Sequence, residues 1–340
     1  MGEVITIGLD LAKSVFQAHG ADALGEVVFR KKLRREQLLA FFAGQARCLV
    51  AMEACASAHY WAREIAALGH ETRLIAPAYV KPFVKRQKND MADAEAICEA
   101  AQRPTMRFVA PKGAEAQAAG VVFRTRDLLV RQRTQLINAL RGHLAEFGHI
   151  ARKGPGHSTR LIELVLDSTT DLPPAARSVL MVVVESLEAM QSKIADLDRE
   201  IAARAKSDEL ARRLMTIPGV GPVTATAMVA LAPPANTFRR GRDFAAWLGL
   251  TPRQHSSGGK ERLGRTSKMG ERSLRRLLIL GASSAARMAA RNGARDPWLA
   301  RMLARKPRML VTVALANKMA RIVWALMAHG GSYRAPAMAA

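Results

Sequence analysis

Cysteine is scarce in this chain, with 3 among 340 residues. Cys48, Cys55 and Cys98 are odd in number and do not have the spacing of zinc ligands. We therefore expect neither a disulfide framework nor a structural zinc site. We expect a reducing, cytoplasmic environment. No secretory signal pattern opens the sequence, which agrees with this expectation.

Long uncharged apolar runs are also missing. The most apolar late stretch, residues 309–329, contains Asn317, Lys318 and Arg321, whereas a membrane-spanning helix needs about 20 consecutive, predominantly apolar residues. We therefore expect this stretch to form an amphipathic packing helix, and we expect no membrane partner.

Acidic residues are few relative to basic ones. Lys and Arg number 52 against 29 Asp and Glu, which gives a formal net charge of +23. This excess is more than solubility requires and suits a polyanionic partner, for which nucleic acid is the first candidate. The charge is uneven, because residues 1–110 carry a net charge of +3 and residues 111–340 carry +20. The second region is therefore expected to hold the nucleic acid.

The residue pattern changes twice along the chain, which predicts three parts. Residues 1–110 are expected to form an α/β domain, residues 111–207 a helical, coiled-coil arm, and residues 208–340 a mainly helical domain. The elements predicted in the first part are three strands up to about Leu33, a helix near Glu36–Ala43, a strand ending at Glu53, a helix near Ser57–Leu68, a strand ending at Ile75, and a helix opening within residues 88–98.

Four carboxylates in the first hundred residues are the clearest candidates for a chemical site. Asp10 and Glu53 each end a predicted buried strand, and Asp90 and Asp93 lie one turn apart on one face of a predicted helix. Such a set can gather Mg²⁺ or Mn²⁺, which prefer oxygen ligands. Two such ions would stabilise the attacking and leaving oxygens of a phosphoryl transfer. Phosphodiester chemistry is therefore predicted.

Each carboxylate also has a purely structural explanation. Asp90 could be an N-cap, Asp93 could be favoured in the first turn by the helix dipole, and Asp10 could lie in a loop. Glu53 is harder to explain in this way, because it follows an apolar run and a buried carboxylate needs a metal, a partner or a raised pKa. The four acids together favour a metal site.

Residues 114–147 have a helical pattern in which arginines alternate with apolar residues. Arginine is well suited to phosphate recognition, so Arg124 and Arg131 are predicted to contact nucleic acid, with a solvated basic face as the alternative. Residues 148–156 break this helix, and a second long helix over Ala175–Lys206 has apolar residues at roughly heptad spacing from Val179 to Ile201. The two helices could form a coiled-coil arm or a dimer contact.

Residues 214–225 predict a tight turn between two short helices. Gly219 and Gly221 would expose backbone N–H groups at a helix N-terminus, which is a favourable site for phosphate. The pattern resembles the helix-hairpin-helix DNA-binding motif, and a plain helix–helix corner is the alternative.

A basic loop lies within residues 237–277, which hold 11 Lys and Arg against 3 Asp and Glu. Ser256 and Ser257 precede Gly258 and Gly259, whose small size allows a phosphate to approach, and the nearby cations would neutralise its charge. An ordinary turn is the alternative. His255 could act as a base or cap the turn, and no Ser-His-Asp order is defensible. The cations predicted to contact nucleic acid here are Arg253, Lys260, Arg262, Arg265, Lys268 and Arg275.

The order of these motifs along the chain is itself distinctive. The four acids come first, followed by a helical arm, and the later motifs are Ile217-Pro218-Gly219-Val220-Gly221, Trp247-Leu248-Gly249-Leu250-Thr251-Pro252, Ser256-Ser257-Gly258-Gly259-Lys260 and Thr266-Ser267-Lys268-Met269-Gly270-Glu271-Arg272-Ser273-Leu274-Arg275. Over nearly its entire length the chain resembles the DEDD transposases of the insertion-sequence-110 family. The resemblance implies a RuvC-like, RNase H-type N-terminal domain and a C-terminal transposase domain with a serine nucleophile.

Further expectations come from the same resemblance. It implies that the four acids bind metal and that Ser257 is the nucleophile, with Ser256 as the second candidate. Serine attack on a DNA phosphate would form a phosphoserine link that conserves bond energy for rejoining. The resemblance also implies recombination guided by a bridging RNA, with the acids and the serine supplied by different subunits. A dimer or tetramer is therefore expected.

Three functions are compared on this basis. The first is an RNA-guided transposase that uses Ser257. The second is a RuvC-like, metal-dependent endonuclease that hydrolyses branched DNA with water and has no need for this serine. The third is a basic nucleic-acid-binding protein whose acids are structural. A covalent protein–DNA adduct that is lost when the serine is replaced distinguishes the first from the others.

Overall fold

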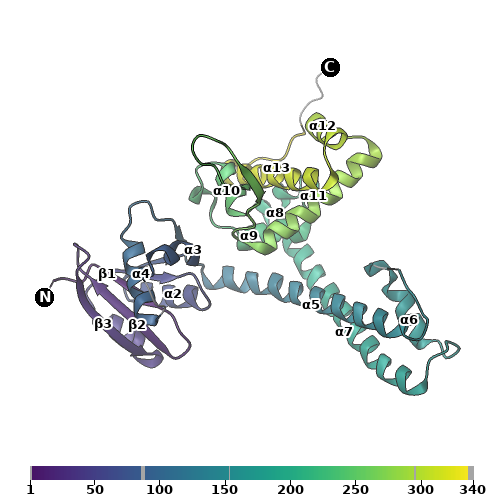
Figure 1. Ribbon diagram of the computed structural model, residues 1–340, viewed down its shortest axis with the longest axis horizontal. Coiled ribbons are helices and arrows are strands. Elements are labelled where there is room, and N and C mark those ends of the chain that lie inside the picture. Colours follow the sequence, from purple (N-terminus) through teal and green to yellow (C-terminus); the bar gives the residue numbers. More distant parts are fainter. Residues whose placement is uncertain (1, 86–88, 153, 295, 336–340) are drawn as a thin grey trace. The chain divides into compact units, whose positions relative to one another are not determined.

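The computed structural model describes residues 2–85, 89–152, 154–294 and 296–335. The chain divides into two compact units, Met1–Ala118 and Ala119–Ala340, and each unit is described by itself. The first unit is mixed α/β and the second is mainly helical (Figure 1). The predicted mixed N-terminal sheet and helical C-terminal region are both confirmed, and the assignment of separate functions to three parts of the chain stays a prediction.

A six-stranded mixed sheet forms the centre of the first unit. The strand order is β3-β2-β1-β4-β5-β6, in which β1 is parallel to β4, β4 is parallel to β5, and the other neighbours are antiparallel. This order is compatible with a RuvC-like domain. The elements of the unit are β1 (Thr6–Asp10), β2 (Val15–Ala21), β3 (Val27–Arg34), η1 (Arg35–Gln37), α1 (Leu38–Ala43), β4 (Leu49–Glu53), α2 (Ala58–Ala67), β5 (Glu71–Ile75), α3 (Pro77–Val80), η2 (Lys81–Phe83), α4 (Asp90–Ala101) and β6 (Phe108–Val109).

Alternation along the central strands divides the apolar side chains between two cores. Ile7 and Leu9 of β1 pack with Phe42 of α1 and Trp61 of α2 on one face of the sheet. On the other face, residues of β4 and β5 pack with α3 and α4. Because successive side chains of a strand point to opposite faces, one strand supplies both cores. The predicted strands and helices of this unit are confirmed, and β6, α3 and η2 were not predicted.

The second unit contains long helices, shorter helices and one hairpin. Helix α5 begins in the first unit, and the linker that was expected between the long helices contains an additional helix, α6. The elements are α5 (Ala114–Ala145), η3 (Pro155–His157), α6 (Ser158–Leu166), α7 (Pro174–Ser207), α8 (Glu209–Leu214), α9 (Pro222–Leu231), η4 (Ala235–Thr237), α10 (Gly241–Trp247), β7 (Pro252–Gln254), β8 (Leu263–Thr266), α11 (Arg272–Asn292), α12 (Pro297–Arg305) and α13 (Arg308–His329).

Helices α5, α6 and α7 share a small apolar core at one end of the unit (Figure 1). An ion pair between Arg126 of α5 and Asp198 of α7, 2.5 Å long, also joins the two long helices. The heptad seam of α7 uses Leu180 and Val184 at its beginning, whereas Val179 is 65% exposed. The two long helices were predicted correctly, but Val179, expected as the first apolar residue of the heptad pattern, lies outside the core of the second helix.

The larger core of the second unit is formed mainly by α8, α9, α10, α11 and α13. Helix α13 is long and apolar enough to cross a membrane by length and composition alone. Within the unit it acts as a core helix, because Val311, Ala316, Ala320 and Val323 are fully buried against its neighbours. The predicted packing helix is therefore confirmed.

Candidate functional site: carboxylates and a serine hairpin

Asp10 and Glu53 lie side by side at the ends of neighbouring parallel strands. Leu9 of β1 is in register with Met52 of β4, so the next residues of these strands are Asp10 and Glu53. Side-chain alternation places Asp10 on the same face as Gly8, which is the face that α4 covers. The same alternation places Glu53 on the face of Ala51, which packs in the core with α4.

Gly8 allows α4 to approach this end of β1. A Cβ atom at Gly8 would lie 2.2 Å from the carbonyl oxygen of Ala94 and 2.5 Å from the backbone nitrogen of Cys98, which no side chain can tolerate. The first turn of α4 carries Asp90 and Asp93. The glycine therefore permits the packing that brings these carboxylates toward Asp10 and Glu53.

The start of α4 corrects one structural explanation of its acids. Asn89, not Asp90, is the N-cap, because its side-chain oxygen accepts a hydrogen bond of 2.8 Å from the backbone N–H of Ala92. Asp90 is the first helical residue and is exposed, while Asp93 is half-buried. Lys88, the first residue of the predicted helix opening, lies outside the described residues.

The other three acids act on Asp10 electrostatically. The pKa of Asp10 is raised from 3.8 to about 6, first by burial and then by the negative charges of Asp93, Asp90 and Glu53. Burial is also the main cause that raises the pKa of the Cys55 thiol, and the charges of Glu53 and Asp10 add to it. This part of the unit therefore holds an excess of negative charge.

A divalent cation fits the donors that gather here. Carboxylate oxygens are the ligands that Mg²⁺ and Mn²⁺ prefer, and a cation would relieve the repulsion that raises the pKa of Asp10. Among the described residues, no three His, Cys, Asp or Glu side chains are already arranged to hold an ion. The backbone thus brings the four acids into one neighbourhood without setting their side chains in ligand geometry.

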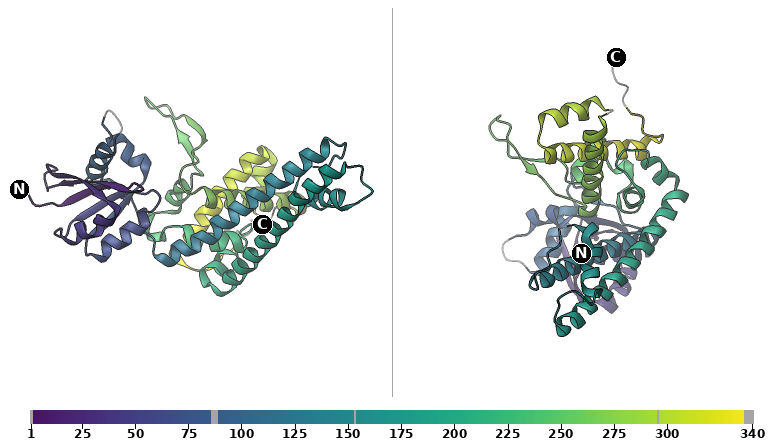
Figure 2. Two further views of the ribbon diagram at one scale, coloured as in Figure 1. Left: turned by 90° about the horizontal axis from the view of Figure 1, so that it is seen from below. Right: turned by 90° about the vertical axis from the view of Figure 1, so that its right-hand side faces the viewer.

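The predicted serine loop is a β-hairpin. Strands β7 and β8 are antiparallel, and Ser257 pairs with Lys260 across a turn in which Gly258 and Gly259 have φ of 56° and 75°. Two consecutive residues with positive φ are typical of a type I′ turn, and glycine adopts this conformation without steric cost. The hairpin extends away from the helices of its unit (Figure 2).

The two serines differ in their hydrogen bonds. The hydroxyl of Ser256 accepts a hydrogen bond of 3.1 Å from the backbone N–H of Arg262, across the hairpin. Within the described part of the chain, the Ser257 hydroxyl has no partner, and no hydrogen bond joins His255 to either serine. A Cβ atom at Gly264 would lie 3.0 Å from the His255 ring, which places that ring against the opposite strand.

The cations of the hairpin are in different environments. Within the described ranges, no ion pair or hydrogen bond holds the side chain of Lys260, Arg262, Arg265 or Lys268. The Arg253 guanidinium donates a long hydrogen bond, 3.4 Å, to the carbonyl of Ser267. Arg275 lies below the hairpin and donates to the carbonyls of Leu248 and Met269, at 3.0 and 2.6 Å. These hydrogen bonds give Arg275 a structural role. The contact of Arg275 with nucleic acid stays a prediction. The exposed cations are Arg253, Lys260, Arg262, Arg265 and Lys268.

The base of the hairpin is closed by backbone contacts. Lys268 has φ of 55°, and its N–H donates to the Gly249 carbonyl at 3.2 Å. Gly249 and Gly270 also have positive φ, and a Cβ atom on Gly270 would lie 1.7 Å from the carbonyl oxygen of Trp247. Substitution of this glycine would force the two segments apart. The exposed tip therefore extends from a tightly packed base.

The turn between α8 and α9 packs on α11. Gly219 has φ of 88°, and a Cβ atom there would lie 2.5 Å from the carbonyl oxygen of Gly281. Gly221, the N-cap of α9, has open space around the corresponding position. The helix–turn–helix shape agrees with the prediction, and its role as a helix-hairpin-helix DNA-binding motif stays a prediction.

The arginines of α5 are partly engaged within the unit. Arg131 lies 3.9 Å from Asp127, which also pairs with Arg276 of α11. Arg124 is exposed, and the described residues offer it no ion-pair partner. Of the two arginines predicted to contact phosphate, Arg124 is therefore the freer one.

Comparison with known proteins gives the family. A family model described as "Transposase IS116/IS110/IS902 family" matches residues 211–298, and an IS110 model of the DEDD type, described as "Transposase", matches residues 7–149. A "Probable family 20 transposase" of Pseudomonas aeruginosa is 51% identical over 331 residues, which cover 96% of this chain and 98% of the relative. The chain belongs to the IS110 family of transposases.

Two further relatives agree over similar lengths. The transposase for insertion sequence element IS1328 of Yersinia enterocolitica is 40% identical over 97% of this chain and 98% of its own length. The transposase for insertion sequence element IS1111A of Coxiella burnetii is 40% identical over 98% of this chain and 92% of its own length. The transposase is thus an enzyme that cleaves and rejoins DNA, and DEDD transposases generally depend on a divalent metal ion.

Two structural features of the transposase were not predicted. Gly8 was assigned only to a strand, although a lone glycine within an apolar strand often marks a close backbone approach. The hairpin was predicted as a loop, although Gly258-Gly259 between two short runs is a hairpin signal. In both cases the signal lies in glycines rather than in chemically reactive side chains.

Proposed function

We propose that the transposase cuts and rejoins DNA through a phosphoserine intermediate on Ser257. What supports Ser257 over Ser256 is that the Ser256 hydroxyl is held by the N–H of Arg262, while that of Ser257 is exposed at the hairpin tip. This is the single observation that carries the choice of nucleophile.

In the proposed step, the Ser257 Oγ forms a bond to the phosphorus of a DNA phosphodiester. The bond from phosphorus to one sugar oxygen breaks, and that oxygen leaves as a hydroxyl after it gains a proton; the serine proton is released to a base or to water. The exposed cations of the hairpin, including Lys260 and Arg262, would neutralise the phosphate charge that opposes the attack. Rejoining is the reverse step with the hydroxyl of a new strand.

The four acids form the second part of the proposed site. Asp10, Glu53, Asp90 and Asp93 would hold one or two Mg²⁺ or Mn²⁺ ions, which when bound would polarise the attacked phosphate. The raised pKa of Asp10 supports a site in which a bound cation would reduce the repulsion between the acids. The role of these residues is to hold that charge at a fixed place on the sheet, at the ends of β1 and β4.

A bridging RNA and a homo-oligomer complete the proposal. The net charge of +20 on residues 111–340 supports binding of more than a short DNA segment. Two long helices, α5 and α7, offer the surfaces of an arm through which two copies could associate. In such an oligomer the acids of one subunit would act together with the serine of another. The proposed nucleic-acid contacts are Arg124, Arg131, Gly219, Gly221, Arg253, Lys260, Arg262, Arg265, Lys268 and Arg275.

The experiment is a strand-transfer assay with the purified transposase. RNA that copurifies with the protein is sequenced, and transfer is measured with and without that RNA, in Mg²⁺ and in EDTA. The proposal expects transfer only when RNA and Mg²⁺ are both present. Hydrolysed product without transfer would instead favour a RuvC-like endonuclease, and full activity in EDTA would remove the metal site.

A further inference from the structure

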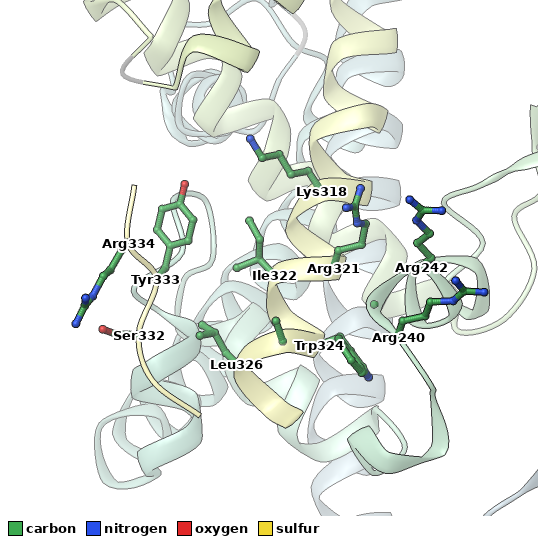
Figure 3. Close-up of a pocket in the computed structure, with 12 residues that line it drawn as sticks. Arg240, Arg242, Lys318, Arg321, Ile322, Trp324, Leu326, Ser332, Tyr333 and Arg334 are labelled. Carbon is green, nitrogen blue, oxygen red and sulfur yellow. The ribbon is translucent and has the colours of Figure 1, made fainter. Parts of the chain in front are cut away.

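A basic cavity in the C-terminal unit is lined by no residue of the serine hairpin and has no role in the proposed chemistry. Its volume is about 670 Å³, within the range of about 300–1,000 Å³ that ligand sites occupy. It lies between α13, the start of α10 and the segment that follows α13 (Figure 3). Five of its lining residues are cations and none is acidic: Arg240, Arg242, Lys318, Arg321 and Arg334.

Four of these cations are free to bind an anion. Lys318 is neutralised, because its Nζ lies 2.5 Å from a carboxylate oxygen of Asp296. The other four are exposed arginines, and no acidic side chain in the described ranges pairs with them. A surface with positive charges that lack acidic partners is suited to bind phosphates, and the planar guanidinium of arginine can bind a phosphate through two hydrogen bonds.

The floor and one wall of the cavity are apolar and aromatic. Ile322 and Leu326 line it from α13, and the Trp324 indole is fixed by a hydrogen bond of 3.1 Å to the Ala235 carbonyl. In Figure 3, Tyr333 and the arginine after it lie on one side of Ile322, and the arginines of residues 240 and 242 lie on the other. A ligand with a flat ring and adjacent phosphates would match both parts.

The backbone holds Tyr333 at this position. Helix α13 ends at two glycines, Gly330 and Gly331, whose φ values of 76° and 79° turn the chain back toward the helix. The Tyr333 N–H then donates to the Thr216 hydroxyl at 2.8 Å. The Tyr333 ring is half-buried, which leaves part of it accessible to a base.

We propose that this cavity binds an unpaired nucleotide of a single-stranded nucleic acid, with the base against Tyr333 and the adjacent phosphates on Arg240, Arg242 and Arg321. A base stacked on Tyr333 would pack against the apolar wall, and the adjacent phosphates would form ion pairs with the free arginines. A duplex would not present a base in this way, because its bases are stacked inside the helix. The inference rests on the nucleic-acid partner of the proposed function, but not on the serine step.

The test is binding of short single strands to the full chain in EDTA, where no cleavage is expected. Fluorescent oligothymidylate and oligouridylate of about eight nucleotides are titrated by anisotropy beside a DNA duplex of equal length. Tyr333→Ala is expected to weaken single-strand binding roughly 5- to 150-fold with little effect on the duplex, and Tyr333→Phe is expected to retain binding. The more tightly bound strand identifies DNA or RNA as the source.

Salt dependence tests the arginines. The double variant Arg240→Ala, Arg242→Ala is expected to reduce the slope of log affinity against log salt by about 1.4 for a single strand. The double variant Arg301→Ala, Arg305→Ala, which removes two exposed cations of α12 outside the cavity, is the matched control for the loss of two positive charges. Thermal unfolding confirms that each variant is folded.

A direct readout separates this cavity from the other basic surfaces. An oligonucleotide that contains 5-iodouracil is photocrosslinked to the chain, and the modified peptide is identified by mass spectrometry. Crosslinking at Tyr333 or Trp324 supports the proposal. Single-strand binding that is unchanged in folded Tyr333→Ala, or crosslinks confined to other peptides, would overturn it. Either result leaves the serine mechanism standing, because binding is measured without cleavage.

Discussion

In the N-terminal unit, Asp10 and Glu53 end strands in the middle of a six-stranded sheet, whereas in the C-terminal unit Ser257 lies at the tip of a two-stranded hairpin. The complete set of acids depends on packing, because α4, which carries Asp90 and Asp93, can approach β1 only where Gly8 has no side chain. The serine depends on backbone conformation, because two glycines with positive φ form the turn beside it. Changes near the acids should therefore affect folding and activity together, and changes at the hairpin tip should affect activity alone.

The largest expected effect comes from removal of one proposed metal ligand. Asp93→Asn keeps the size of the side chain but removes a charge that acts on Asp10. DNA cleavage in Mg²⁺ is expected to fall about 100-fold or more, because a ligand of the proposed metal is lost. Cleavage rates on a labelled substrate measure it.

The matched control lies on the same helix. Glu99→Gln makes the same chemical change at a side chain that is 38% exposed and that, among the described residues, forms its ion pair with Arg103 in the next turn. Its cleavage rate should remain within about twofold of the parent, because an exposed ion pair contributes little. Equal losses in Asp93→Asn and Glu99→Gln would remove the case for a special role of Asp93.

The next effect tests the close packing at Gly8. Gly8→Ala is expected to destabilise the N-terminal unit by about 1–3 kcal/mol and to lower cleavage, because α4 must move away from β1. Chemical denaturation measures the free energy of unfolding. Gly142→Ala, in the exposed part of α5 with open space around its Cβ position, should be neutral or stabilising by up to about 1 kcal/mol. A neutral Gly8→Ala would show that α4 does not need this glycine.

The hairpin should respond in the opposite manner. Gly258→Ala places a Cβ atom at φ of 56°, which disfavours the turn beside Ser257. Cleavage is expected to fall by about tenfold, since a misplaced catalytic group loses rate steeply, while the melting temperature of the protein stays unchanged. A matching loss of melting temperature and activity would mean that the hairpin is coupled to the core after all.

The smallest effect is a pH dependence of stability without metal. The pKa of Asp10 in the folded protein, about 6, lies above its ordinary value of 3.8, so the folded state binds this proton more tightly than the unfolded state. The Asp10 contribution to stability is therefore full below about pH 4 and is lost as the pH rises through about 6. In EDTA, Asp10→Asn should lack this part of the decline between about pH 4 and pH 7.

Addition of Mg²⁺ extends the same measurement. At about pH 7.5, Mg²⁺ should raise the melting temperature of the parent more than that of Asp10→Asn, because binding to the folded state stabilises it. Identical melting curves for both proteins with and without Mg²⁺ would contradict a cation site at Asp10.

The sequence was sufficient to predict the elements around the acids. Val4–Asp10 and Arg47–Glu53 have apolar runs that end in a carboxylate, and strands β1 and β4 end at those residues. Strand order in the sheet could not be derived from these runs, because pairing depends on contacts between distant segments. The close packing of α4 on β1 could not be predicted from these runs either, because it depends on the absence of a side chain at Gly8.

The C-terminal unit was less predictable for a different reason. Helix α6 is short, nine residues, and follows a glycine-containing segment, and it is stabilised by packing of Leu161 and Val165 against the long helices. The basic cavity combines residues near 240, 320 and 333, which only the folded chain brings together. Tertiary contacts, rather than local propensity, decide both features.

The proposal that the acids bind metal while Ser257 attacks the DNA is tested most directly by identifying the covalent intermediate. The transposase is incubated with DNA, RNA and Mg²⁺, denatured and digested, and the nucleotide-bearing peptide is identified by mass spectrometry. The account predicts a phosphodiester link on Ser257, absent in Ser257→Ala and retained in Ser256→Ala. A nucleotide attached to another residue, or cleavage by the parent with no protein-linked DNA, would contradict it.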